Sequence, residues 1–151
     1  MHNNWILVAS QAGSQVFSVT NRRKKLELVT KIENPNGRKK DQDLVTDRPG
    51  FSVKDGRGGG RALVHEDSAK EHAATQYAKS VIDVLEEGRK ANKYQKLIIV
   101  AEPSFESYLK VHIKPKLENT VFQTIHKNYF SMNKEEIYER IKEQVLYSFP
   151  P

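Results

Sequence analysis

The sequence predicts an α/β protein: a mixed five-stranded sheet with helices packed on it. Three apolar runs of strand length follow one another closely near the N-terminus, which is typical of a β-meander. Later in the chain, helical periodicity alternates with two more short apolar runs, which is typical of parallel strands joined by helices. We therefore expect one domain over residues 1–151, because this length suits a single hydrophobic core.

The first three strands are expected at WILVA (5–9), QVFSVT (15–20) and LELVTKI (26–32). The first run is continuously apolar, as in a central strand that is buried on both faces. The other two alternate, which suits strands with one wetter face. The links between the runs are short enough for hairpins, so we predict an antiparallel meander.

Residues 33–64 show neither strand nor helix periodicity. They contain six of the eight glycines, three of them consecutive in DGRGGGRAL (55–63). A loop of this length is uncommon inside a compact domain, and is usually functional or disordered. We therefore predict a long mobile loop here.

A long amphipathic helix is expected after this loop. Ser68 and Glu71 form a capping box, and apolar residues then recur at spacings of three and four until Gly88, which we expect to end the helix.

The rest of the chain predicts the order strand, helix, strand, helix. KLIIVA (96–101) has the pattern of a buried parallel strand, and a shorter helix is expected from Pro103 until Pro115 stops it. VFQTI (121–125) is the fifth expected strand, and a helix capped by Asn133 follows. The parallel part of the sheet is therefore expected to be covered by helices.

Composition limits the classes of function. A net charge of +6 and a pI near 9.4 favour polyanionic partners such as RNA. The chain has no cysteine, which excludes disulfides, thiolate metal sites and a cysteine nucleophile. We find neither a signal-peptide pattern nor an apolar run long enough to span a bilayer, so we expect a cytoplasmic protein with no membrane partner.

No cofactor or metal is expected. The sequence has no P-loop, dinucleotide-binding glycine pattern or Ser-His-Asp order. Its one His/Glu cluster, His65, Glu66, Glu71 and His72, lacks the spacing that places metal ligands on one helical face.

Residues 5–146 resemble the bacterial family of proteins required for attachment to host cells. The resemblance is carried by WILVA with Ala12 and Val16-Phe17, by NPNGRKKDQDLVTDRPG (34–50), by Glu71 with Tyr77-Ala78, and by LIIVAEPSF (97–105). Its most specific part is TDRPG, which includes Asp47, Arg48, Pro49 and Gly50. By residue type this motif is a turn, and the resemblance implies a functional role for it. Ser10 and Phe51 depart from the family, in which an aspartate and an arginine are expected.

DGRGGGRAL followed by a capped helix is also similar to the catalytic domain of archaeal and eukaryotic class 1 peptide chain release factors. In that domain a loop of the form GRGGQ-x-x-A-L helps water to cleave the ester between peptide and tRNA. The resemblance places Gly58 and Gly59 on the two loop glycines and Gly60 at the glutamine. Because Gly60 cannot supply an orienting side-chain amide, we expect little or no hydrolysis of peptidyl-tRNA.

Three functions follow from these observations. The first is a translation-associated factor, non-catalytic or weakly catalytic, that binds the ribosome or tRNA through the glycine-rich loop. The second is host-cell attachment through protein partners, and the third is an ester hydrolase of the peptidyl-tRNA type.

The phosphate contacts of the first function are expected from basic residues of the loop segment, namely Arg38, Lys39, Lys40, Arg48, Arg57 and Arg61. Asp41, Asp43, Asp47 and Asp55 lie among them, so a solvated charged surface is the alternative interpretation.

Overall fold

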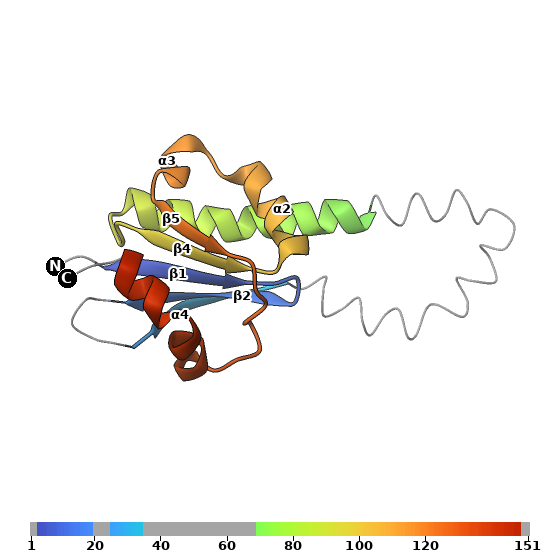
Figure 1. Cartoon of the computed structure of the whole chain (residues 1–151). Coiled ribbons are helices and arrows are strands. Elements are labelled where there is room, and N and C mark those ends of the chain that lie inside the picture. Colours follow the sequence, from blue (N-terminus) through green and yellow to red (C-terminus); the bar gives the residue numbers. More distant parts are fainter. Residues whose placement is uncertain (1–2, 20–24, 35–68, 149–151) are drawn as a thin grey trace, which may run out of the picture.

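The computed structural model describes residues 3–19, 25–34 and 69–148, with side chains described as far as Val145. Its sheet has the strand order β3-β2-β1-β4-β5, with helices on both faces (Figure 1). The strands are β1 (Asn4–Ala9), β2 (Gly13–Val19), β3 (Glu27–Glu33), β4 (Leu97–Ala101) and β5 (Val121–Ile125). The mixed five-stranded α/β sheet predicted from the sequence is confirmed.

β1 is the central strand, as its continuously apolar sequence predicted. It pairs antiparallel with β2 and parallel with β4, and all six of its residues are buried. β2 pairs antiparallel with β3, and β4 pairs parallel with β5. The predicted meander therefore forms one half of the sheet, and the predicted parallel strands form the other.

Helices cover the two faces unequally. A long helix, described over residues 69–90, lies on one face together with α2 (Pro103–His112) and α3 (Pro115–Glu118). The other face is covered by α4 (Lys134–Ser148) (Figure 1). None of the helices in the described part of the chain combines the length and apolarity needed to cross a bilayer.

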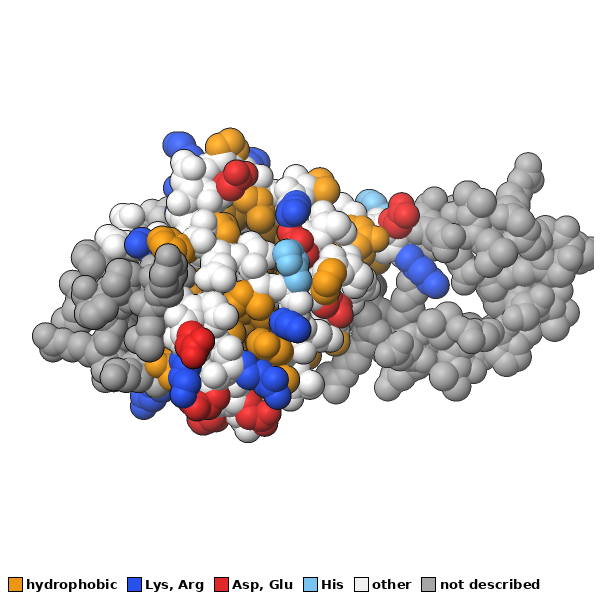
Figure 2. All heavy atoms as spheres, viewed as in Figure 1, with side chains coloured by type: hydrophobic (Ala, Val, Ile, Leu, Met, Phe, Trp, Pro, Cys, Tyr) orange, Lys and Arg blue, Asp and Glu red, His pale blue; other side chains and the backbone are white. Residues whose placement is uncertain are grey.

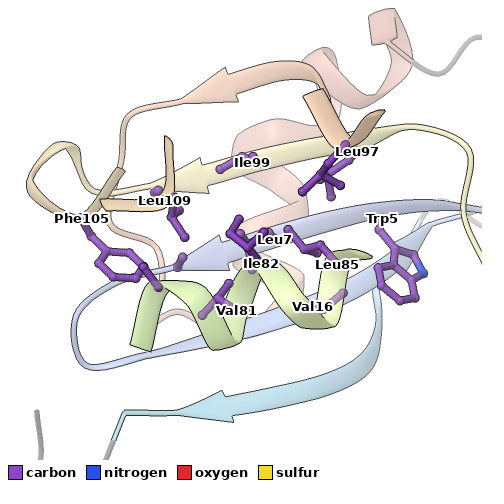
Figure 3. Packing of buried hydrophobic residues seen from close by; sticks show 14 of the residues in the cluster. Trp5, Leu7, Val16, Val81, Ile82, Leu85, Leu97, Ile99, Phe105 and Leu109 are labelled. Carbon is purple, nitrogen blue, oxygen red and sulfur yellow. The ribbon is translucent and has the colours of Figure 1, made fainter. Parts of the chain in front are cut away.

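Successive side chains of β1 point alternately into the two hydrophobic cores, one on each face of the sheet. Trp5, Leu7 and Ala9 point toward the long helix, and Ile6 and Val8 point toward α4. Figure 3 shows the first of these cores, in which side chains of β1 and β4 meet those of the long helix and α2. This period of two is the reason that one strand can anchor two layers of helices.

The long helix does not end at Gly88, contrary to the sequence prediction. Gly88 is buried beneath the ring of Trp5: a Cβ at this position would lie 2.5 Å from Trp5 Cη2. The helix continues to residue 90, and the chain reverses at Asn92, which has the left-handed φ of 57° that asparagine tolerates. The glycine therefore provides space for an indole, which stacks on Tyr94 with ring centroids 4.5 Å apart.

The helix predicted from Pro103 ends before Pro115, as expected, and the proline has a second role. α2 ends at His112, and Pro115 opens the separate short helix α3. Proline suits the first turn because its missing N–H would have no intrahelical partner there. The predicted cap of the last helix is confirmed, because Glu136 N–H donates to Asn133 Oδ1 at 2.8 Å.

We expect Gly88→Ala to lower the free energy of unfolding by about 1–3 kcal/mol, because the methyl group would overlap an indole that Tyr94 holds in place. Helix propensity alone would favour alanine by about 1 kcal/mol. Urea denaturation measures the difference, with Lys79→Ala, an exposed position on the same helix, as the control. A Gly88→Ala variant more stable than wild type would contradict this interpretation of the contact.

Candidate functional site

Polar residues directly follow the four strands that run in the same direction. β1, β3, β4 and β5 end at one side of the sheet, as the registers Ala9↔Ala101, Gly13↔Glu33 and Val100↔Ile125 show. The residues after these strands are Ser10, Asn34, Glu102 and His126. We call these four residues and the turn between β1 and β2 the carboxyl edge. Open α/β sheets bind ligands at this side, so we take it as the candidate site.

The turn between β1 and β2 is closed by its own hydrogen bonds. Ser10 N–H donates to Gly13 O at 2.9 Å, and Gly13 N–H donates to Ser10 O at 3.3 Å. Ser10 Oγ accepts from Ala12 N–H at 3.1 Å, so the hydroxyl lies within the turn. Gln11 and Ala12 remain exposed at its tip.

Side chains from distant parts of the sequence hold this turn. Glu102 Oε1 accepts from Gln11 N–H at 2.9 Å, and Asn34 Nδ2 donates to Gln11 O at 2.6 Å. The second oxygen of Glu102 accepts from Asn128 Nδ2 at 3.2 Å. These bonds join the turn, the end of β3, the start of α2 and the link between β5 and α4 into one polar network.

Tyr77 fixes the long helix to the same turn. Its hydroxyl donates to Ser10 O at 2.9 Å and lies 2.6 Å from Ser14 Oγ. Burial raises the pKa of Tyr77 to about 12, against the opposing effect of the Ser14 hydrogen bond. The hydroxyl is therefore protonated at neutral pH and remains a donor. The ring stacks on Phe105 of α2 at 5.0 Å.

Glu106 and His126 form a carboxylate–imidazole pair at the end of β5. Glu106 is buried in α2, and its carboxylate lies 2.9 Å from His126 Nε2 and 3.2 Å from Lys110 Nζ. The imidazole is half exposed. The buried carboxylate thus orients an imidazole that a polar ligand can reach.

The side chains of the carboxyl edge provide hydrogen-bonding groups, and neither serine hydroxyl there is paired with a base that would make it a nucleophile. Within the described residues, the hydroxyls of Ser10 and Ser14 bond to backbone groups and to Tyr77, with no histidine or carboxylate as a base. No group of three metal-ligating side chains occurs in that same part of the chain. What this edge presents is the exposed turn, the imidazole and the amide of Asn128.

The site residues predicted from the sequence lie outside the described residues. These are Gly58, Gly59 and Gly60, the basic residues Arg38, Lys39, Lys40, Arg48, Arg57 and Arg61, and the motif residues Asp47, Pro49 and Gly50. The two elements that flank their segment, β3 with the Asn34 that follows it and the long helix, are described, and each has a residue bonded to the turn of the carboxyl edge. Asn34 bonds to Gln11, and the long helix, described from residue 69, bonds through Tyr77 to Ser10.

Local sequence patterns do not predict the polar network at the carboxyl edge. Tyr77 and Ser10 enter the sequence prediction only through the family resemblance, Tyr77 as a residue that carries it and Ser10 as a departure from it. No role is predicted for Glu102 or His126, although each directly follows a predicted apolar strand. That position after a strand is the signal that could have identified them.

Comparison with known proteins gives one family match. Residues 5–141 match the model of the family described as "Protein required for attachment to host cells". No curated protein matches the chain. The matched range includes every residue of the carboxyl edge.

We expect Tyr77→Phe to lower the free energy of unfolding by about 1–2 kcal/mol at neutral pH, because the buried Ser10 carbonyl loses its donor. The pKa of Tyr77 is about 12 in the folded state and about 10 when unfolded, so its protonation stabilises the fold below pH 10. This contribution, about 3 kcal/mol, disappears as the pH rises from 10 to 12. Denaturation at several pH values measures both effects.

Tyr94→Phe is the matched control. Burial also raises the pKa of Tyr94 to about 12, but its hydroxyl donates to Leu85 O, away from the carboxyl edge. Both variants are expected to lose stability less steeply than wild type between pH 10 and 12. Identical pH profiles for the three proteins would show that ionisation of these two buried hydroxyls does not cause the loss of stability between pH 10 and 12.

Proposed function

The chain belongs to the family of proteins required for attachment to host cells, and we propose that its molecular role is that of a translation-associated factor. It binds the ribosome or tRNA through the glycine-rich segment and hydrolyses little or no peptidyl-tRNA. This role places the protein in the cytoplasm.

The observation that carries the proposal is that the two described elements flanking the glycine-rich segment are attached to the same turn. Asn34 and the long helix are both bonded to the turn between β1 and β2. The segment between them contains the basic residues expected to contact phosphates. Segments that connect elements at this side of an α/β sheet commonly carry its binding residues. RNA is the polyanion that a net charge of +6 favours in the cytoplasm.

The choice of ribosome or tRNA, over other polyanions, is supported by the resemblance to release-factor catalytic domains. The glycine-rich stretch of this chain precedes the long helix, as in those domains. Gly58 and Gly59 allow the backbone to approach RNA without a Cβ. Gly60 lacks the amide that orients water, which supports binding without efficient hydrolysis.

We expect the full chain to co-sediment with ribosomes from a native-like lysate at low salt and to dissociate at high salt, because phosphate contacts release counterions. Replacing both Arg57 and Arg61 with alanine should reduce the bound fraction by at least about tenfold. The control replaces Lys134 and Lys142, two exposed lysines of α4, and should bind as wild type does. Absence of the wild-type protein from every ribosomal fraction at low salt would overturn the proposal and favour the attachment function through protein partners.

A peptidyl-tRNA hydrolysis assay separates binding from catalysis. We expect a rate at the level of the uncatalysed reaction, and no change on Gly59→Ala or Gly60→Ala, because the chain has no glutamine at the position of Gly60. A clear turnover that Gly59→Ala abolishes would instead establish the ester hydrolase.

A further inference from the structure

We infer that His126 accepts a hydrogen bond from a ribose 2′-hydroxyl of bound RNA, so that this residue makes the protein prefer RNA over DNA. The inference rests on the proposed function, because it takes RNA as the ligand, and it adds the residue that recognises the sugar. Three observations carry it: the hydrogen bond between His126 and Glu106, the exposure of the imidazole at the carboxyl edge, and the charges around the ring.

The contacts of Glu106 determine which nitrogen of His126 carries a proton. One carboxylate oxygen lies 3.2 Å from the ammonium group of Lys110, and the other lies 2.9 Å from His126 Nε2. An ionised carboxylate can only accept hydrogen bonds, so Nε2 is the donor. In the neutral imidazole the remaining nitrogen, Nδ1, is then an acceptor. A ligand that bonds to Nδ1 therefore has to supply a hydrogen-bond donor.

The acceptor nitrogen belongs to a ring that a ligand can reach. Glu106 is 8% exposed in α2, whereas the side chain of His126, directly after β5, is 52% exposed. In the described part of the chain, Glu106 is the one side chain that hydrogen-bonds to this imidazole. Figure 2 shows histidine, acidic and basic side chains close together in the middle of the face that carries α2 and the end of β5. The buried carboxylate thus holds the ring and leaves Nδ1 accessible to a ligand.

The charges next to the imidazole favour an uncharged donor at Nδ1. Glu106 contacts the other nitrogen of the ring, and Glu102 lies one turn earlier, at the start of α2. A phosphodiester placed against the neutral ring would be repelled by both carboxylates and has no proton to donate. A hydroxyl carries no charge and supplies the donor. Every ribose of RNA has such a 2′-hydroxyl, and the sugar of DNA lacks it.

Lysines beside the imidazole suit the phosphates on either side of that ribose. Lys127 directly follows His126, is exposed, and forms no ion pair with any other described residue. Lys110 is also exposed and contacts the same carboxylate as the imidazole. Phosphate contacts carry no information about the sugar, so the lysines contribute affinity and His126 contributes the preference. An uncharged glycan would use the acceptor but not the lysines, so RNA fits this edge better.

The test is fluorescence anisotropy with three fluorescein-labelled oligonucleotides of equal length and one base: oligouridylate, its 2′-deoxy analogue and its 2′-O-methyl analogue. We expect the full chain to bind oligouridylate about fivefold more tightly than either analogue, because each analogue lacks the donor of one hydrogen bond. His126→Ala should lose the preference for oligouridylate over the 2′-deoxy analogue. Circular dichroism establishes that each variant is folded.

Two control variants separate the hydroxyl contact from the phosphate contacts. Lys127→Ala should weaken the binding of oligouridylate and of its 2′-deoxy analogue by the same factor, which leaves the preference unchanged. His72→Ala removes an exposed histidine of the long helix, and it should keep the full preference.

Nitrogen NMR of the imidazole tests the contact directly. In the free protein we expect Nε2 of His126 to carry the proton and Nδ1 to lack it. Oligouridylate should shift the Nδ1 resonance more than the 2′-deoxy analogue does. The inference is overturned by an unchanged preference in His126→Ala, by wild-type protein that binds all three oligonucleotides equally, or by no binding of any of them at millimolar concentration. An equal shift of Nδ1 with maltose would also overturn it, in favour of a glycan.

Failure of this inference is distinguishable from failure of the proposed function. Ribosome co-sedimentation of the wild-type protein tests the proposed function. A preference for oligouridylate that His126→Ala removes supports the inference even when no ribosomes co-sediment, and a preference that His126→Ala retains overturns it even when they do.

Discussion

The burial of β1 on all sides is the constraint on which the rest of the structure depends. Its backbone is paired with β2 and β4, so both edges of the strand are occupied. Its side chains alternate between two cores, and each core is closed by the helices on its own face of the sheet. A strand that is apolar on both faces can lie only in the middle of a covered sheet. The meander supplies the strand that pairs with one edge of β1. The strand–helix units supply the strand at its other edge and the helices that cover the faces.

The carboxyl edge follows from the same constraint. Because β2 returns directly beside β1, the turn between them has to lie where β4 also ends. Glu102 follows β4 and is therefore placed to accept from Gln11, 91 residues earlier in the chain. Tyr77 reaches the same turn from the long helix. The network thus connects both halves of the sheet.

Local patterns predicted the strands, the central place of β1 and the cap at Asn133, because period and capping chemistry act within a few residues. The prediction that Gly88 ends the helix was wrong because the reason for this glycine is the ring of Trp5, 83 positions away. The polar network was missed for the same reason. Its bonds join residues such as Ser10 and Tyr77 that only tertiary packing brings together. The glycine-rich segment remains a sequence prediction, since it lies outside the described residues.

Trp5 has a consequence for how this molecule can be observed. It is the one tryptophan of the chain, 4% exposed and stacked on Tyr94 where β1 begins. The carboxyl edge lies at the other end of the same strand. The intrinsic indole emission therefore reports whether the sheet and the long helix are assembled, and it is insulated from events at the turn between β1 and β2. The chain carries a built-in optical probe of its folding, whereas binding at the carboxyl edge has to be followed with a label placed there.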